Sequence, residues 1–181
     1  MERALLIHLI FPYTGATLPL LPDLKKSPRL QVLDTGMLNY FAGIQKEVLG
    51  TTDLNVVYQG TMIEHLVGQE LLAGQHNSLS NLHFWVREKK TSTAEVDYVY
   101  PYDSKLIPIE VKSGTEGRLR SLHLFMDIAP HNMAIRFYAG NVNLTKNVTQ
   151  AGKTYHLLSL PYYLVSQIEK YVEWLWQETQ N

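Results

Sequence analysis

Two short segments of the chain alternate between apolar and polar side chains, which is the pattern of a half-buried β-strand. Residues 95–100 read Glu-Val-Asp-Tyr-Val-Tyr, and residues 107–112 read Ile-Pro-Ile-Glu-Val-Lys. The intervening Tyr-Asp-Ser favours a turn, so we expect an antiparallel hairpin. Few folds combine such a hairpin with several carboxylates, and this feature therefore restricts the chain more than any other.

Strict alternation assigns the side chains of this hairpin to two faces. Val96 and Tyr98 share the apolar face. Asp97, Glu110 and Lys112 share the opposite face. Carboxylate oxygens are the ligands that Mg²⁺ and Mn²⁺ prefer, and a bound cation can polarise a phosphoryl oxygen and lower the pKa of its water. A lysine beside it can orient that water or offset charge in the transition state.

A further carboxylate lies upstream, in a segment that we expect to be helical. Residues 55–73 carry apolar side chains at helical spacing, and Glu64 lies on the flank of that apolar stripe. Glu64, Asp97 and Glu110 are therefore expected to hold Mg²⁺ or Mn²⁺, with Lys112 assisting the water. The alternative is that Glu-x-Lys forms an exposed ion pair and that the acidic residues lie on a solvated face.

Composition limits the chemistry and the surroundings of the protein. The 181 residues, of which 45% are hydrophobic and 18% charged, suit one domain with a substantial core. The absence of cysteine excludes disulfides, thiolate metal sites and a cysteine nucleophile, and it fits a cytoplasmic location. The net charge of -1 lends no support of its own to nucleic-acid binding. No apolar run reaches the ~20 residues of a membrane helix, and no phosphate-loop motif predicts an ATP site.

The remaining segments predict an α/β fold with a mixed central sheet flanked by helices. Further strands are expected over residues 5–10, 29–33, 82–87, 132–138 and 154–158, and further helices over residues 36–48, 117–128 and 161–177. Asp34 is expected to cap the helix that follows it. Residues 139–153 are interpreted as a polar stretch, and Trp85 is expected to pack in the core.

The combination of these motifs resembles the PD-(D/E)xK nuclease superfamily. More closely, the chain is similar to domain of unknown function 4143, which is found at the C-terminus of AAA-type ATP-binding proteins. The resemblance covers roughly residues 5–160 and rests on Leu-Asp-Thr-Gly-Met-Leu at 33–38, Gly-Thr-Met-Ile-Glu-His-Leu-Val at 60–67, Glu-Leu at 70–71, Trp85 and Arg87, Glu-Val-Asp at 95–97, Ile-Glu-Val-Lys-Ser-Gly at 109–114, and Leu122 and Phe125.

This resemblance implies a restriction-endonuclease-like core of helix, three strands, helix and strand. It implies Asp97 and Glu110 as metal ligands, Lys112 as the catalytic lysine and Glu64 as the helix-borne acid. Residues 1–34 would be the strand and loop that remain of a winged-helix-like connector, and residues 35–181 the nuclease-like domain. Because family members usually begin with an ATPase domain, an ATPase is an expected partner.

Four basic side chains, Arg87, Lys89, Lys90 and Arg118, are candidates for contacts with substrate phosphates, and solvated loop charges are the alternative. The main hypothesis is a Mg²⁺-dependent nuclease-like domain that acts on phosphodiesters in nucleic acid. A competing hypothesis is a non-catalytic module that binds nucleic acid or protein for an AAA-type ATPase. A third is a dimeric scaffold built on the aromatic-rich C-terminal helix.

Overall fold

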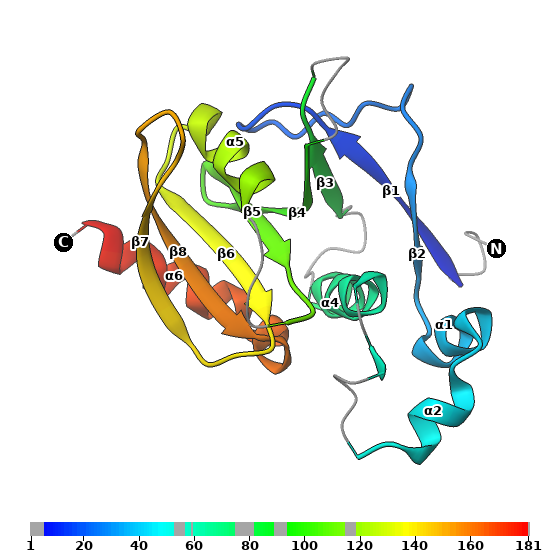
Figure 1. The fold of residues 1–181 in the computed structure, drawn as a ribbon. Coiled ribbons are helices and arrows are strands. Elements are labelled where there is room, and N and C mark those ends of the chain that lie inside the picture. The colour runs from blue at the N-terminus through cyan, green and yellow to red at the C-terminus, as the bar shows by residue number, and fades with distance from the viewer. Residues whose placement is uncertain are drawn as a thin grey trace.

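The computed structural model describes residues 6–52, 57–58, 60–74, 82–88, 94–114 and 119–180, and these form an α/β fold around one mixed sheet (Figure 1). The strands are β1 (Ile7–Tyr13), β2 (Arg29–Val32), β3 (His83–Val86), β4 (Glu95–Tyr102), β5 (Lys105–Val111), β6 (Met133–Tyr138), β7 (Asn143–Val148) and β8 (Thr154–Pro161). The helices are α1 (Thr35–Ala42), α2 (Gln45–Gly50), α4 (Thr61–Ala73), α5 (Arg120–Ile128), the 3₁₀ helix η2 (Tyr162–Gln167) and α6 (Ile168–Gln180). The predicted class, a mixed sheet flanked by helices, is confirmed.

The eight strands of the described chain lie in the order β2-β1-β3-β4-β5-β6-β8-β7. Strands β3, β4 and β5 form an antiparallel meander, as the sequence predicts for β4 and β5. Strands β5, β6 and β8 are parallel, so their carboxyl ends lie together at one end of the strands (Figure 1). The expected strands near the N-terminus, β1 and β2, join the same sheet through the parallel pairing of β1 with β3.

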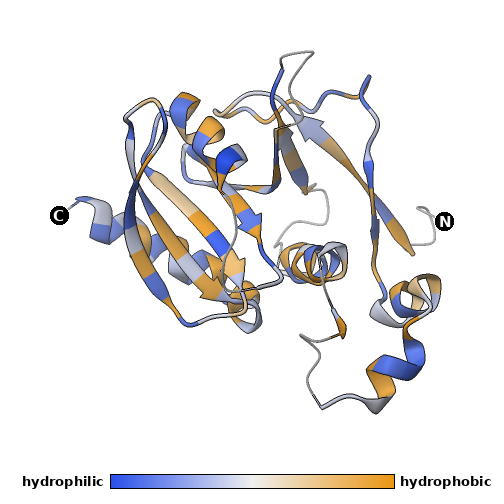
Figure 2. Cartoon of the chain, viewed as in Figure 1, coloured by the Kyte–Doolittle hydropathy of each residue, from blue (hydrophilic) through white to orange (hydrophobic). Residues whose placement is uncertain are grey.

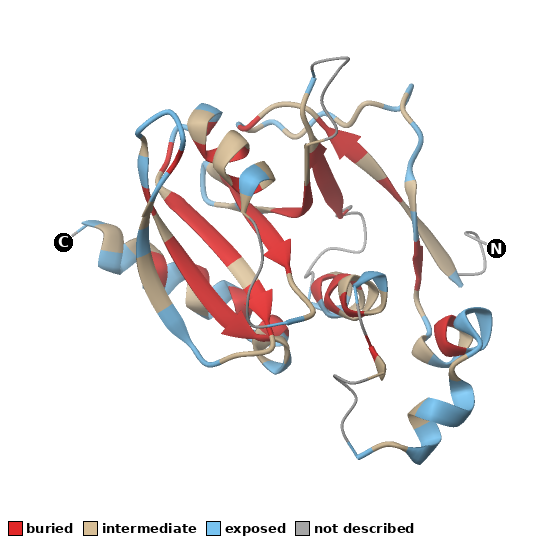
Figure 3. Cartoon of the chain, viewed as in Figure 1, coloured by how far each residue is buried: buried red, intermediate tan, exposed pale blue. Residues whose placement is uncertain are grey.

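Each face of the sheet is covered by helices, and each interface has its own hydrophobic core. Val67 and Leu71 of α4 and Val172 of α6 belong to one buried cluster. Leu122 and Phe125 of α5 belong to a second cluster on the other face. The central strands β5, β6 and β8 are apolar and mostly buried (Figures 2 and 3). None of the described helices combines the length and apolar character needed to cross a bilayer.

The helix predicted over residues 36–48 is wrong in one respect, because the structure divides it into α1 and α2. Gly43 has a φ of 69° and ends α1 in the left-handed conformation, which glycine adopts without steric cost. The predicted cap is confirmed, since the Asp34 carboxylate accepts a hydrogen bond from the Met37 amide at 2.6 Å. Helix α1 lies at the end of β2, and α2 lies below α1 and away from the strands (Figure 1).

Two further predictions need correction. Residues 139–153, interpreted as a polar stretch, contain strand β7, which pairs only with β8 at the edge of the sheet. An edge strand leaves much of its surface in water, so its polar composition hides it from a pattern based on apolar alternation. The closing helix begins as the 3₁₀ helix η2 before α6. Trp85 is confirmed as a core residue with 1% of its surface exposed.

Gly68 allows α4 to lie close against the sheet. A Cβ at this position would come within 2.5 Å of both Gln31 Oε1 and Tyr98 Oη. Neither side chain is free to move, because Gln31 Nε2 donates to the carbonyl of His65 at 2.8 Å and Tyr98 Oη donates to the carbonyl of Glu64 at 2.8 Å. Helix α4 therefore docks on β2 and β4 through a contact that admits no side chain at Gly68.

We expect Gly68→Ala to lower the free energy of unfolding by about 1–2 kcal/mol. Two contacts of 2.5 Å with hydrogen-bonded side chains place the cost of overpacking in the upper part of its usual range, at about 2–3 kcal/mol, and the gain in helix propensity returns about 1 kcal/mol. Urea denaturation followed by circular dichroism measures this change. Gly50→Ala in α2 is the matched control, since an added Cβ there meets no atom within 4 Å. Equal stability of the Gly68→Ala and wild-type proteins would contradict the close approach.

Candidate functional site

The predicted carboxylates Asp97 and Glu110 lie on the neighbouring strands β4 and β5. Tyr98 pairs with Ile109, and β4 departs from β5 immediately before this pair. Where the two strands separate, Asp97 Oδ2 accepts a hydrogen bond from the Val111 amide at 2.7 Å. The Asp97 side chain thus replaces the main-chain carbonyl of β4 that would otherwise accept this bond. Asp97 and Glu110 are both buried, with 8% and 5% of their surfaces exposed.

The third predicted carboxylate, Glu64, reaches this place from the first turn of α4. Its main-chain carbonyl accepts a hydrogen bond from Tyr98 Oη, which joins the helix to β4. Its carboxyl group lies close enough to Asp97 to raise the pKa of that residue. The structure therefore brings Glu64, Asp97 and Glu110 into one electrostatically coupled group, which we call the acidic cluster.

The face assignment by strict alternation is wrong for Val96. Val96 packs with Trp85 and Val99 in the cluster beneath α5, whereas Tyr98 packs in the cluster beneath α4. The cause is a register shift between β3 and β4, in which His83 pairs with Val99 but Trp85 pairs with Val96. An irregularity of this kind turns part of a strand and re-aims its side chains, and it lies at Asp97.

Lys112 follows β5 directly and contacts the acidic cluster. Its ammonium group donates a hydrogen bond to Glu110 Oε1, so the Glu-x-Lys ion pair of the alternative hypothesis is present. The pair is not a solvated one, because only 7% of the Glu110 side chain is exposed. The second carboxylate oxygen, Glu110 Oε2, is buried and has no hydrogen-bond partner among the described residues.

Burial and mutual repulsion change the protonation of the cluster. The pKa of Asp97 is raised well above its usual range, first by burial and then by the nearby charges of Glu110 and Glu64. Burial also raises the pKa of Glu110, although the Lys112 ammonium group acts in the opposite direction. A buried carboxylate pair of this kind gains stability from a proton or a cation, which removes the uncompensated charge.

A divalent cation fits these residues in part. Among the described residues, no group of three or more His, Cys, Asp or Glu side chains is arranged to hold a metal ion. Mg²⁺, however, usually takes only one or two protein carboxylates and keeps water or substrate phosphate as its other ligands. The unpaired Glu110 Oε2 and the repulsion between Asp97 and Glu110 are the features that such a cation would satisfy.

Two arginines lie at the cluster without having been predicted there. Arg29 of β2 donates from Nη1 to the main-chain carbonyl of Asp97 at 3.3 Å and forms an ion pair with Glu95. Arg136 of β6 is the strand neighbour of Glu110 and donates from Nε to Ser159 Oγ at 3.1 Å. No local pattern identifies Arg29. Arg136 is a charged residue within the mostly apolar strand predicted over residues 132–138, and this signal could have identified it.

The predicted phosphate contacts are described only in part. Arg87 lies just beyond β3, where its backbone amide donates to the carbonyl of Ala94 at 3.0 Å and its side chain is half-buried. Lys89, Lys90 and Arg118 lie outside the described residues. Their role in phosphate binding remains a prediction from the sequence.

The fold and the cluster define an α/β protein with a buried acidic site and an adjacent lysine at the end of a central strand. The family model "Domain of unknown function (DUF4143)" matches residues 59–163, and the chain belongs to this family. The matched segment begins just before α4 and includes all four residues of the predicted site. No curated protein and no solved structure gives a significant match to the chain.

We expect Asp97→Asn to stabilise the metal-free protein at neutral pH. The folded-state pKa of Asp97 lies above its unfolded value of about 3.9, so the folded state holds the proton more tightly and stability falls as pH rises through the folded-state pKa. Asparagine removes the charge and keeps an acceptor for the Val111 amide. The midpoint of thermal unfolding should rise by about 2–4 °C for each kcal/mol gained.

Thermal scans in the presence of EDTA between pH 4 and neutrality measure this effect, and the gain should shrink toward the acid end. Asp103→Asn is the control, because Asp103 is exposed and its pKa is lowered by hydrogen bonding to Lys105. A gain that is the same at every pH would show that charge at Asp97 is not its cause.

Proposed function

We propose that this domain is a metal-dependent nuclease-like domain that hydrolyses phosphodiesters in nucleic acid. The observation that carries the proposal is the pair of buried, mutually repelling carboxylates, Asp97 and Glu110, with Lys112 in contact and one Glu110 oxygen unpaired. Folding a chain around such a pair costs stability, and a cation that binds both carboxylates accounts for their presence.

The topology supports membership of the PD-(D/E)xK superfamily. The order α4, β3, β4, β5, α5, β6 is the sequence of helix, three strands, helix and strand expected of a restriction-endonuclease-like core. Within it β3, β4 and β5 are antiparallel, and β6 returns parallel to β5. The acidic residues occupy the second and third strands of this unit, and Glu64 the first helix.

In the proposed reaction Asp97 and Glu110 would hold Mg²⁺ or Mn²⁺, and Glu64 would act beside them as the helix-borne acid. The cation, when bound, polarises a phosphoryl oxygen and supplies water of lowered pKa. Lys112 carries three ammonium protons, of which one is directed at Glu110, and the others can hold the attacking water or a phosphoryl oxygen. Arg136, the strand neighbour of Glu110, would add positive charge that attracts the phosphate.

A second candidate is a non-catalytic module that binds nucleic acid or protein and serves an AAA-type ATPase. It is favoured by the absence of a three-ligand group among the described residues and by the Lys112 ammonium group, which already contacts Glu110. Both candidates are consistent with a cytoplasmic location, for which the cysteine-free composition is the argument.

We expect the purified protein to cleave labelled nucleic acid in the presence of Mn²⁺ or Mg²⁺ and not in EDTA. Glu110→Gln and Lys112→Ala should each lower the cleavage rate at least ~100-fold, because each removes charge that acts on the reacting phosphate. The assay should offer single- and double-stranded DNA and RNA. Lys146→Ala, at an exposed lysine of the edge strand β7, is the control and should retain the wild-type rate.

Calorimetric titration of Mn²⁺ into the metal-stripped protein separates the two candidates. The nuclease-like site should bind Mn²⁺ saturably, and Asp97→Asn should weaken this binding by at least tenfold. Metal-dependent cleavage that survives both Glu110→Gln and Lys112→Ala would refute the proposed site. Absence of metal binding and of cleavage, together with co-purification of this protein with a phosphate-loop ATPase, would favour the non-catalytic module.

A further inference from the structure

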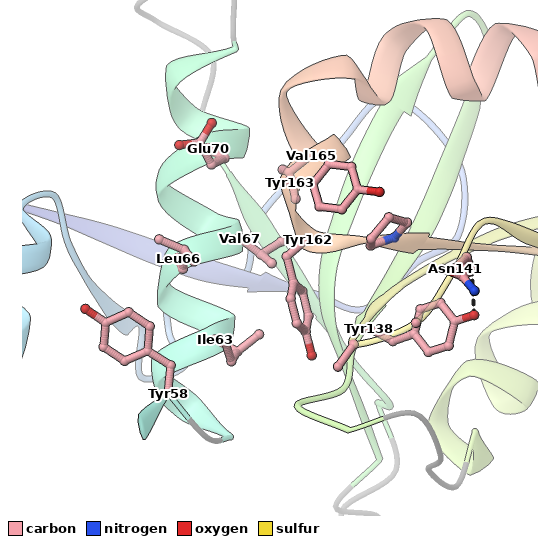
Figure 4. A pocket seen from close by; sticks show the side chains of 13 residues that line it. Tyr58, Ile63, Leu66, Val67, Glu70, Tyr138, Asn141, Tyr162, Tyr163 and Val165 are labelled. Atoms are coloured by element: carbon pink, nitrogen blue, oxygen red, sulfur yellow. Dashed lines mark hydrogen bonds between the residues drawn. The ribbon is translucent and has the colours of Figure 1, made fainter. Parts of the chain in front are cut away.

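A cavity of about 580 Å³ lies between α4, the turn after β6, and η2 (Figure 4). Four tyrosines line it: Tyr58, Tyr138, Tyr162 and Tyr163. We call it the tyrosine cavity. Its volume is within the range of about 300–1,000 Å³ that is usual for small-molecule sites. It is separate from the acidic cluster, and the proposed chemistry does not account for it.

The tyrosine cavity lies next to the acidic site because of the strand directions. Strands β5, β6 and β8 are parallel, so Lys112, Tyr138 and Tyr162 all lie at the carboxyl ends of these strands. The Tyr162 hydroxyl donates a hydrogen bond to the main-chain carbonyl of Lys112. Ligands of α/β sheets commonly bind outside the carboxyl ends of strands. In this protein both the cavity and the proposed catalytic lysine lie at those ends.

Three of the four tyrosine rings are held by hydrogen bonds at their hydroxyl groups. Tyr58 Oη accepts from Asn39 Nδ2 at 2.9 Å, and Tyr138 Oη donates to the carbonyl of Asn141 at 2.6 Å. Tyr162 is fixed by the carbonyl of Lys112. Tyr163 differs, since 79% of its surface is exposed. The cavity thus has fixed aromatic walls and one aromatic ring open to solvent.

The charges of the lining disfavour an anionic ligand. Glu70 is the one charged residue among the described residues that line the cavity, and no lysine, arginine or histidine is among them. The side of α4 that faces the cavity contributes Ile63, Leu66 and Val67, which are apolar. Asn141 adds a side chain with both donor and acceptor groups. A neutral planar ligand with polar edges matches these walls, and a phosphate group does not.

We propose that the tyrosine cavity binds an unpaired nucleobase of a single-stranded segment whose phosphate backbone passes Lys112. The inference rests on the proposed function and deepens it, because it names the substrate class. Bases stack on aromatic side chains with little dependence on sequence. A base enters such a cavity only after it leaves the helical stack, so single strands and frayed ends are bound in preference to intact duplex.

Fluorescence anisotropy with a labelled oligothymidine and a duplex of equal length tests this preference, with Ca²⁺ in place of Mg²⁺ and with integrity of the strand checked by gel. We expect the single strand to bind at least tenfold more tightly than the duplex. Tyr163→Ser should weaken single-strand binding about tenfold, because base–aromatic stacking is lost. Tyr40→Ser is the matched control, since Tyr40 is an equally accessible tyrosine, 67% exposed, on α1.

Photocrosslinking of the same oligonucleotide carrying 5-iodouracil, followed by peptide mapping, locates the base independently of activity. A crosslink to Tyr162 or Tyr163 supports the proposal. Wild-type affinity in Tyr163→Ser, or a crosslink that maps elsewhere, overturns it, and in that event cleavage in Mn²⁺ that Glu110→Gln abolishes still upholds the nuclease proposal. Absence of binding to either oligonucleotide, with no cleavage of any substrate, overturns both.

Discussion

The organisation of this protein depends on the point at which β4 separates from β5. There the Asp97 carboxylate, and not a strand carbonyl, accepts the hydrogen bond of the Val111 amide. At the same residue the register shift between β3 and β4 turns Val96 away from Tyr98, so that Tyr98 can donate to the carbonyl of Glu64 and position α4. Together these two features at Asp97 satisfy the backbone, place a carboxylate next to Glu110 and bring a third carboxylate from a helix.

The electrostatic character of the site follows from its burial. An exposed Glu-x-Lys pair is screened by water and contributes little to stability. Glu110 is 5% exposed, and Asp97 and Glu64 lie close by, so the charge of Lys112 only partly offsets the carboxylates. Proteins seldom retain clustered buried carboxylates without a function, because their separation from water is costly. This argument connects the packing of the central strands with the proposed binding of a cation.

The sequence predicted most of the central sheet, because buried strands alternate or run apolar over lengths that local patterns detect. It also predicted that Asp97, Glu110 and Lys112 lie on neighbouring strands. It failed at β7, whose polar composition reflects its place at an edge, and at Gly43, where one helix becomes two. It did not anticipate Arg29 beside Asp97, because that contact joins two residues that are 68 positions apart in the chain.

By itself, the sequence determined the two alternating strands, the helix that bears Glu64 and the order in which these carboxylates occur, since each depends on residues close together in the chain. The division at residue 34 between a connector and a nuclease-like domain remains a prediction. Only the tertiary structure decided the depth of burial that raises the pKa of Asp97, the register shift that turns Val96, and the position of Tyr162 against Lys112. These depend on the packing of distant segments and on long-range strand pairing, which no local pattern encodes.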